Sequence, residues 1–313
     1  MSLAPPLSLV KQVVSQIFPS SCCRVERVEE GVSTYVHRIH QANNVFYLRI
    51  LPEEHASFVP EAQVHQQLLA RSVKVPEIIY VEDNNELLQC SIMVTTEIKG
   101  THCGDCSSAN SLQTILFEAG KDLAIINSIP VEGFGWIRRN GNKFTLLEAE
   151  HPTLRAFVYE HLESDLAELA HIVLPEKDIS AIHAILKRYD NLLDEDRSWL
   201  AHGDFDMTHI YQKQGRYSGI IDFGEIRGTH ALYDLSHFRV HDGEMLPILL
   251  FPYLLEGYYE MTALPHDYEQ RIVLTSLLIT IRTLARAMKR HPQSFQEHHA
   301  LKVLKRDVQA LLA

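Results

Sequence analysis

The sequence predicts an α+β protein with two lobes, a small antiparallel sheet followed by a larger and mostly helical part. Between residues 24 and 96, apolar and polar residues alternate in short runs separated by turn-forming residues, which is typical of antiparallel strands. After residue 100, the apolar residues recur at helical spacing. This segregation of strands and helices along the chain indicates lobes of residues 1–97 and 98–313.

The first lobe is predicted to begin with an amphipathic helix over residues 6–18, which Pro19 ends. In the strand predicted at residues 45–51, Arg49 and Tyr47 share one face, and Leu48 lies on the other. The further elements expected in this lobe are strands at 25–28, 34–40, 78–82 and 87–96, and a helix that starts near Pro60.

The second lobe is predicted to hold one β-hairpin among helices. The hairpin strands are residues 208–211 and 217–221, and a polar segment with a glycine separates them. The helices are expected at about 112–126, 153–173, 177–193, 246–260, 267–290 and 294–312.

The bulk composition excludes several kinds of partner. The chain has 313 residues and a net charge of −11, so we expect no nucleic-acid partner, because phosphate contacts need clustered Lys and Arg. The longest apolar run, at 246–255, is too short to cross a membrane and contains two prolines. No signal peptide is recognisable, and five cysteines are not a disulfide framework, so a cytoplasmic location is predicted. The oligomeric state is not predicted.

Two acidic residues, Asp204 and Asp222, flank the predicted hairpin at its two ends. Pairing of the strands brings both carboxylates into one neighbourhood. Such a pair can supply one proton acceptor and one metal ligand.

Three motifs around these residues carry a resemblance to a known family. They are His202-Gly203-Asp204, Ile221-Asp222-Phe223-Gly224 and Tyr233-Asp234-Leu235, and weaker support comes from Tyr47-Leu48-Arg49, Pro60-Glu61-Ala62 and the segment 129–135. In this order and spacing they resemble the aminoglycoside phosphotransferase (APH) family, relatives of the protein kinases, over nearly the whole chain. The resemblance implies a protein-kinase-like fold. It also implies transfer of the γ-phosphate of ATP or GTP to a hydroxyl of a small molecule, such as an aminoglycoside-like antibiotic, a sugar or an amino alcohol.

The resemblance also implies roles for individual residues. Asp204 would accept the proton of the acceptor hydroxyl or orient that hydroxyl, and Asp222 would hold Mg²⁺. Arg49 would contact the nucleotide phosphates and pair with Glu61, although a surface ion pair between these two is an alternative. The adenine would meet backbone groups of the hinge, at Glu97 and Ile98. Asp234 would anchor the catalytic loop as a hydrogen-bond acceptor.

Two positions depart from the family pattern. His209 stands where these enzymes have a metal-binding asparagine, and its nitrogen suits Mn²⁺ or a transition metal better than Mg²⁺. It could instead contact the phosphates, or it could be a spacer. The phosphate-covering loop has a single glycine, Gly31, which leaves the backbone amides near Ser33 and Thr34 as candidate phosphate contacts.

Other polar residues near the motifs are candidates for contacts with the acceptor. Asp206 could assist the acceptor or only turn its own loop, while Glu225 and His230, with His237 or His241, could line the acceptor pocket. An acidic pocket would favour an acceptor that bears an amine. Four basic residues on the helix 267–290 are instead predicted to form an exposed face: Arg282, Arg286, Lys289 and Arg290.

Two other functions are compatible with the sequence. The sparse phosphate loop and His209 are compatible with a catalytically weak, kinase-like binding module. A metal-dependent hydrolase would use Asp204, His209 and Asp222 as ligands, but it would leave the first lobe without a role.

Overall fold

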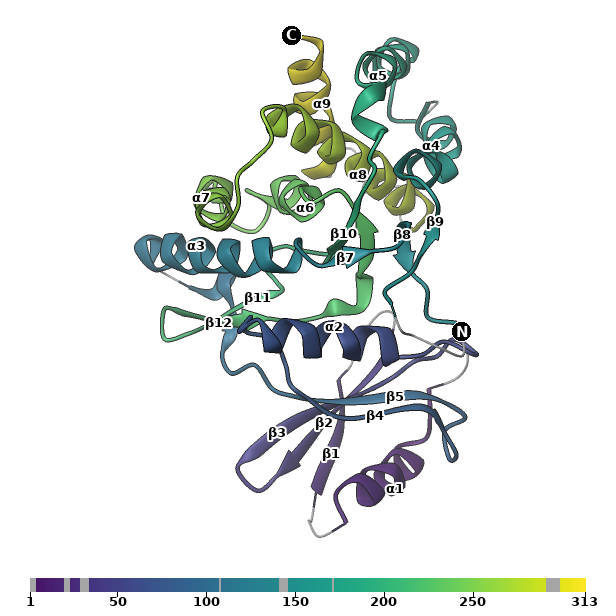
Figure 1. Cartoon of the computed structure of the whole chain (residues 1–313), viewed down its shortest axis with the longest axis vertical. Coiled ribbons are helices and arrows are strands. Elements are labelled where there is room, and N and C mark those ends of the chain that lie inside the picture. Colours follow the sequence, from purple (N-terminus) through teal and green to yellow (C-terminus); the bar gives the residue numbers. More distant parts are fainter. Residues whose placement is uncertain are drawn as a thin grey trace.

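The computed structural model describes residues 4–19, 23–28, 34–106, 108–140, 146–170, 172–290 and 299–313. Figure 1 shows a sheet lobe below a larger helical lobe, with the two stacked along the long axis of the molecule. The predicted fold class is therefore confirmed.

The sheet lobe is built on five antiparallel strands in the order β1-β2-β3-β5-β4. Their core lies against helix α1, where Val10 and Val14 pack with Leu48 and Ile50. Arg49 lies between those two apolar residues on β3 and therefore projects to the opposite face, as the alternation predicted. The elements of this lobe are α1 (Leu7–Ile17), β1 (Cys23–Val28), β2 (Tyr35–Gln41), β3 (Asn44–Ile50), α2 (Val59–Ala70), β4 (Ile78–Asn85) and β5 (Cys90–Thr96).

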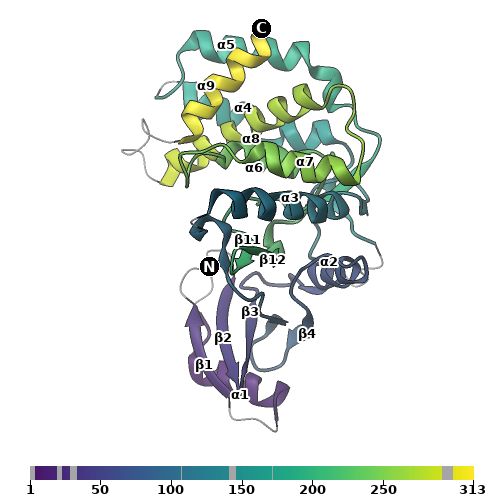
Figure 2. The ribbon, with the colours of Figure 1, turned by 90° about the vertical axis from the view of Figure 1, so that its left-hand side faces the viewer.

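Helix α3 (Ala109–Ile126) crosses between the hairpin and the remaining helices, as Figure 2 shows. The hairpin strands are β11 (Ile210–Lys213) and β12 (Arg216–Ile220), which pair with β6 (Thr101–His102) in a small sheet. The other helices of this lobe are α4 (Leu154–Ala170), α5 (Glu176–Arg188), α6 (Tyr233–His241), α7 (Phe251–Met261), α8 (Tyr268–Arg290) and α9 (His299–Leu312).

A second five-stranded sheet, in the order β7-β10-β13-β8-β9, carries the loop of Asp204, which follows β10. The sequence did not reveal it, because its strands have only two to four residues, too few for an alternating pattern to emerge. The strands are β7 (Pro130–Val131), β8 (Phe134–Ile137), β9 (Ala149–His151), β10 (Ser198–Ala201) and β13 (Arg227–Thr229). Three 3₁₀ turns complete the fold, η1 (Cys103–Asp105), η2 (Asp190–Leu193) and η3 (Phe223–Glu225).

Some predicted helix boundaries were wrong. The helix expected at 246–260 begins only at Phe251, and its first turn includes Pro252. The helix expected at 177–193 is divided into α5 and the turn η2. The start predicted for the last helix, at 294–298, lies outside the described residues. No helix in the described ranges is long and apolar enough to cross a membrane.

Candidate active site

The loop that follows β10 holds Asp204 and is attached to α6 by a buried carboxylate. Asp234 accepts hydrogen bonds from the backbone N–H groups of His202 at 2.8 Å and Gly203 at 2.9 Å, and from Asn127 Nδ2 at 2.8 Å. Gly203 has φ +89°, and a Cβ there would lie 1.9 Å from the carbonyl oxygen of Glu225. The predicted anchoring role of Asp234 is thus confirmed, and the loop backbone has little freedom to move Asp204.

Asp222 lies at the end of β12 in a left-handed backbone conformation, with φ 65° and ψ 69°. Its carboxylate accepts the Gly224 N–H at 3.3 Å, and Oδ1 lies 3.6 Å from Arg49 Nη2. Burial opposes ionisation, but the positive charge of Arg49 and the neighbouring imidazoles outweigh it and lower the pKa of Asp222. The group is therefore a carboxylate at neutral pH.

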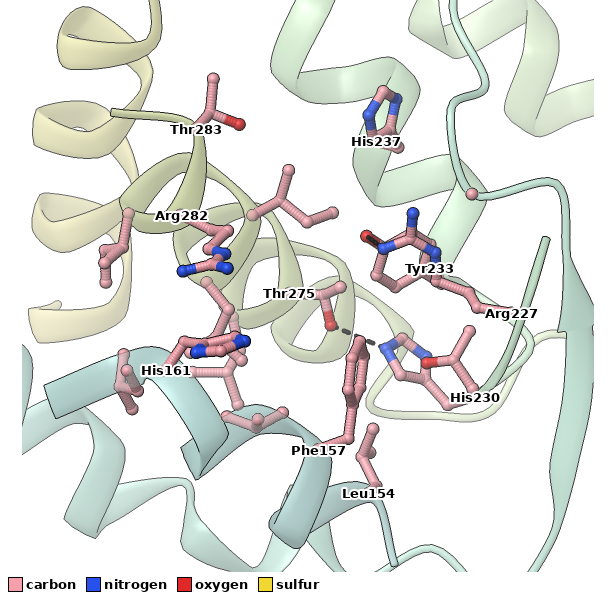
Figure 3. A pocket seen from close by; sticks show the side chains of 18 of the residues that line it. Leu154, Phe157, His161, Arg227, His230, Tyr233, His237, Thr275, Arg282 and Thr283 are labelled. Carbon is pink, nitrogen blue, oxygen red and sulfur yellow. Dashed lines mark hydrogen bonds between the residues drawn. The ribbon is translucent and has the colours of Figure 1, made fainter. Parts of the chain in front are cut away.

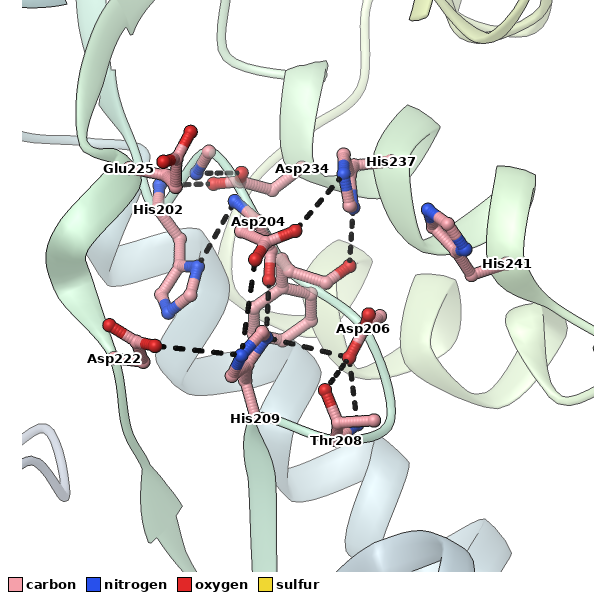
Figure 4. A network of polar contacts seen from close by, with 12 residues as sticks. His202, Asp204, Asp206, Thr208, His209, Asp222, Glu225, Asp234, His237 and His241 are labelled. Atoms are coloured by element: carbon pink, nitrogen blue, oxygen red, sulfur yellow. Dashed lines mark hydrogen bonds and ion pairs between the residues drawn. The ribbon is translucent and has the colours of Figure 1, made fainter. Parts of the chain in front are cut away.

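His209 lies between the two carboxylates (Figure 4). Its Nδ1 is 2.6 Å from the carbonyl oxygen of Asp204, which can only accept, so Nδ1 carries the proton. In the neutral ring, Nε2 then presents its lone pair, 3.9 Å from Asp204 Oδ2 and 3.9 Å from Asp222 Oδ2. In most metal-binding histidines, one ring nitrogen donates its N–H to a backbone carbonyl or a similar acceptor, and the other nitrogen is free to bind the metal. The donor set of this nitrogen and the carboxylates fits a divalent cation.

Asp206 turns the loop. It accepts hydrogen bonds from both the backbone N–H and the hydroxyl of Thr208, which is an Asx turn. Its Oδ1 is also 3.4 Å from His209 Nδ1. Asp204, Asp206 and His209 can bring one donor atom each to within 4.8 Å of one another. Asp206 therefore positions His209 from the side opposite Asp222.

A buried ion pair links the strand β3 to the helix α2. Arg49 donates to Glu61, whose side chain has no exposed surface. Arg139 approaches the same carboxylate at 3.3 Å and also donates to the carbonyl oxygen of Gly224 at 2.8 Å. The surface ion pair considered from the sequence is thus excluded, because both partners are largely removed from water. The pair holds Arg49 beside Asp222.

The predicted nucleotide contacts lie along the edge of the sheet lobe. The Glu97 backbone N–H donates to the carbonyl oxygen of Val45 at 3.3 Å, and Ile98 lies beside Gly219. Thr34 is buried at the start of β2, whereas Ser33 lies outside the described residues.

A cavity of about 570 Å³ lies in the helical lobe and reaches Asp204. It is enclosed by α4, α6, α8 and β13, and its inner wall is shown in Figure 3. Both Glu225 and His230 line it, as does His237, whose Nε2 is 3.5 Å from Asp204 Oδ1. Burial lowers the pKa of His237 to about 3, so a neutral imidazole faces Asp204.

Two other cavity residues differ in their freedom to meet a ligand. His230 is buried, and its Nε2 is already paired with the Thr275 hydroxyl at 2.8 Å. Burial lowers the pKa of His230 to about 3 and raises that of Glu225. Glu225 is more accessible and lies 3.4 Å from Arg227 Nη2.

The predicted exposed basic face on α8 is confirmed at Arg286 and Lys289, which are exposed, but Arg282 is half-buried, and both Arg282 and Arg286 line the cavity. Helical periodicity places residues four apart on one face but does not reveal what that face meets. Trp136 and Arg271 also line the cavity and were not recognised from the sequence. Neither belongs to a motif, so only the fold reveals them.

The two-lobed fold and the paired carboxylates define a protein of the kinase-like class. The model of the phosphotransferase enzyme family, APH, matches residues 24–268, and the chain belongs to this family. The predictions of the family and of a small-molecule phosphotransferase are therefore confirmed. A comparison with curated proteins gives no match.

Solved structures with the same fold include three phosphotransferases. A thermostable mutant of aminoglycoside phosphotransferase APH(4)-Ia, in a ternary complex with ADP and hygromycin B, is 15% identical with a TM-score of 0.70. A putative fructosamine-3-kinase from Thermobifida fusca YX-ER1 is 16% identical with a TM-score of 0.63, and the GDP complex of aminoglycoside 2'-phosphotransferase-IIIa is 14% identical with a TM-score of 0.63. Each match covers 96% of this chain and 98% of the other.

Proposed function

We propose that this phosphotransferase transfers the γ-phosphate of ATP or GTP to a hydroxyl of a small molecule held in the cavity beside Asp204. One observation carries the proposal. Asp204 has one carboxylate oxygen toward the cavity, near His237, and the other toward His209 and Asp222. A group in this position can meet an acceptor hydroxyl from one side and a phosphate from the other.

Asp204 accepts the proton of the acceptor hydroxyl, or orients that hydroxyl, as the phosphoryl group is transferred. The neutral His237 donates its Nδ1–H to the carbonyl oxygen of Phe205 at 3.2 Å, which holds the ring in place with Nε2 toward Asp204. Solved relatives that contain ADP or GDP support nucleotide binding. We assign the nucleotide-binding role to residues 1–97, with Arg49 toward the phosphates and the backbone of Glu97 and Ile98 toward the base, and the catalytic role to 98–313.

Asp222 and His209 are the residues that would hold a divalent cation, whose charge would neutralise the phosphate oxygens. A ring nitrogen beside carboxylates suits Mn²⁺ better than Mg²⁺, which prefers oxygen ligands. The Nδ1–H of His209 already donates to the Asp204 carbonyl. The same bond therefore orients the imidazole and holds it beside the catalytic loop.

The test is an acceptor screen of antibiotics, sugars and amino alcohols with ATP and with GTP, each run with Mg²⁺ and with Mn²⁺. Asp204→Ala is expected to abolish transfer to any acceptor found, whereas Asp83→Ala, at an exposed position of β4, retains it. Full turnover of Asp204→Ala would refute the assignment. Nucleotide binding without transfer would favour a binding module, and phosphate release without nucleotide dependence would favour a hydrolase.

A further inference from the structure

The cavity beside Asp204 is basic, although the protein as a whole has a net charge of −11. Four arginines and three carboxylates line it, and one of those carboxylates is Asp204 itself. The remaining wall is largely apolar, with leucine, isoleucine and phenylalanine side chains from α4 and α8. Arginines thus outnumber carboxylates by one in the wall, and a ligand meets a largely apolar surface with a few charged groups.

Three of the arginines already have partners. Arg227 lies over the ring of Trp136, 4.0 Å from its centroid, and pairs with Glu225. Arg282 donates to both carboxylate oxygens of Asp165 at 2.9 Å. Arg271 is held by Asp267 at 2.9 Å and by Glu195. Their charges are largely compensated within the protein.

Arg286 has no hydrogen-bond or ion-pair partner among the described residues. It lies one helical turn after Arg282 on α8, lines the cavity and is solvent-exposed, so it stands at the cavity opening. Partial burial and the nearby charge of Arg282 lower the pKa of Arg286, whereas the Glu225 carboxylate opposes the shift. The guanidinium therefore keeps its hydrogen-bond donors available to an anionic ligand at the cavity opening.

A second group in the wall also lacks a partner. The Thr229 hydroxyl is buried, lines the cavity and makes no hydrogen bond within the part of the chain that the structure describes. Unpaired buried hydroxyls are uncommon in folded proteins, because burial of a hydroxyl without a hydrogen bond is unfavourable. A polar group of a bound ligand would satisfy it.

We propose that the acceptor carries a carboxylate, bound by Arg286, on an apolar body that rests against α4 and α8, with its hydroxyl toward Asp204. This inference rests on the proposed function, because it takes the cavity as the acceptor site. A guanidinium binds a carboxylate through two parallel hydrogen bonds, which gives both affinity and orientation. A polycationic acceptor would meet uncompensated positive charge instead.

The test uses acceptors that differ only in charge. One set is 4-(hydroxymethyl)benzoate, 4-(hydroxymethyl)benzamide and 4-(hydroxymethyl)benzylamine, and matched sets carry naphthyl and cyclohexyl bodies. Binding to the full chain with ADP is measured by calorimetry, and transfer from ATP is scored separately in the presence of Mg²⁺ or Mn²⁺. We expect the carboxylate of at least one set to bind about tenfold or more tightly than its amide and amine.

The variant Arg286→Gln is expected to remove that preference and leave ADP affinity unchanged. Lys289→Gln, which removes a charge from an exposed position of the same helix outside the cavity, is the matched control and retains the preference. Equal or tighter binding of the amines, no binding by any set, or a preference that survives in Arg286→Gln would overturn the inference. Carboxylate binding without phosphate transfer would support it and count against the proposed function alone.

Discussion

The buried pair of Arg49 and Glu61 allows the structural and functional roles of Arg49 to be separated. Arg49→Met leaves the Glu61 side chain with no exposed surface and, among the described residues, with Arg139 at 3.3 Å as its remaining ion-pair partner. Removal of one member of a buried pair costs about 3–5 kcal/mol, and the remaining Arg139 favours the lower end. For a chain of 313 residues, about 3 kcal/mol corresponds to a fall in Tm of roughly 5 °C.

The double variant Arg49→Met, Glu61→Leu removes both charges at once. Arg139 still has the carbonyl oxygen of Gly224, so no charge is left stranded, and we expect Tm to recover to within about 2 °C of the parent. Nucleotide affinity is not expected to recover, because the contact from Arg49 to the phosphates is still absent.

Thermal melts and calorimetric titration with ATP measure the two effects on the same samples. The loss of affinity should be about tenfold or more in both variants, since the contact is charge-assisted. A double variant no more stable than Arg49→Met would refute the buried-charge reasoning. Parent-like ATP affinity in the double variant would refute the phosphate role of Arg49.

Three further predictions concern the catalytic loop and the cavity. In His209→Asn, loss of the ring nitrogen should shift the metal preference toward Mg²⁺. The ratio of activity with Mn²⁺ to activity with Mg²⁺, measured across metal titrations, should fall by about tenfold, and an unchanged ratio would contradict a nitrogen ligand. Asp234→Ala removes the acceptor of three buried N–H groups, so amide hydrogen exchange at His202 and Gly203 should accelerate by about 100-fold or more. Protection as in the parent would contradict the role of Asp234 in anchoring the loop. Below pH 6.5, His230 binds a proton in the unfolded chain, whereas in the folded protein the buried His230 ring, with a pKa of about 3, stays neutral. At pH 5 this difference lowers the free energy of unfolding by about 2 kcal/mol. Urea unfolding of His230→Gln should therefore show a smaller pH dependence than the parent.

Much of the fold could be predicted because successive residues of the first sheet face two different environments. Leu48 and Ile50 meet α1 while Arg49 faces away, so the alternation in the sequence directly reflects the environment of each side chain. The strands of the second sheet could not be found this way. In β13, for example, all three residues are buried, which gives no alternation to recognise.

The two candidate catalytic carboxylates could be located from their motifs, but the character of the cavity beside Asp204 could not. Asp204 and Asp222 lie in contiguous segments with strong local signals. The cavity instead combines α8 with β13 and α4, and its charge depends on which arginines find partners across those elements. Asp165 compensates Arg282 from 117 residues away in the chain, a pairing that no local pattern indicates.

The two carboxylates are held by different contacts, and His209 lies between them. Asp204 is attached to the helical lobe, because Asp234 on α6 holds the backbone immediately before it. Asp222 follows β12 in the same lobe, and Arg49 on β3 of the sheet lobe lies 3.6 Å from its carboxylate. His209 belongs to the loop of Asp204 but presents Nε2 equally to both carboxylates. A cation bound there would contact both carboxylates, so we expect an exchange of histidine for asparagine at this position to alter transfer more than the binding of either substrate.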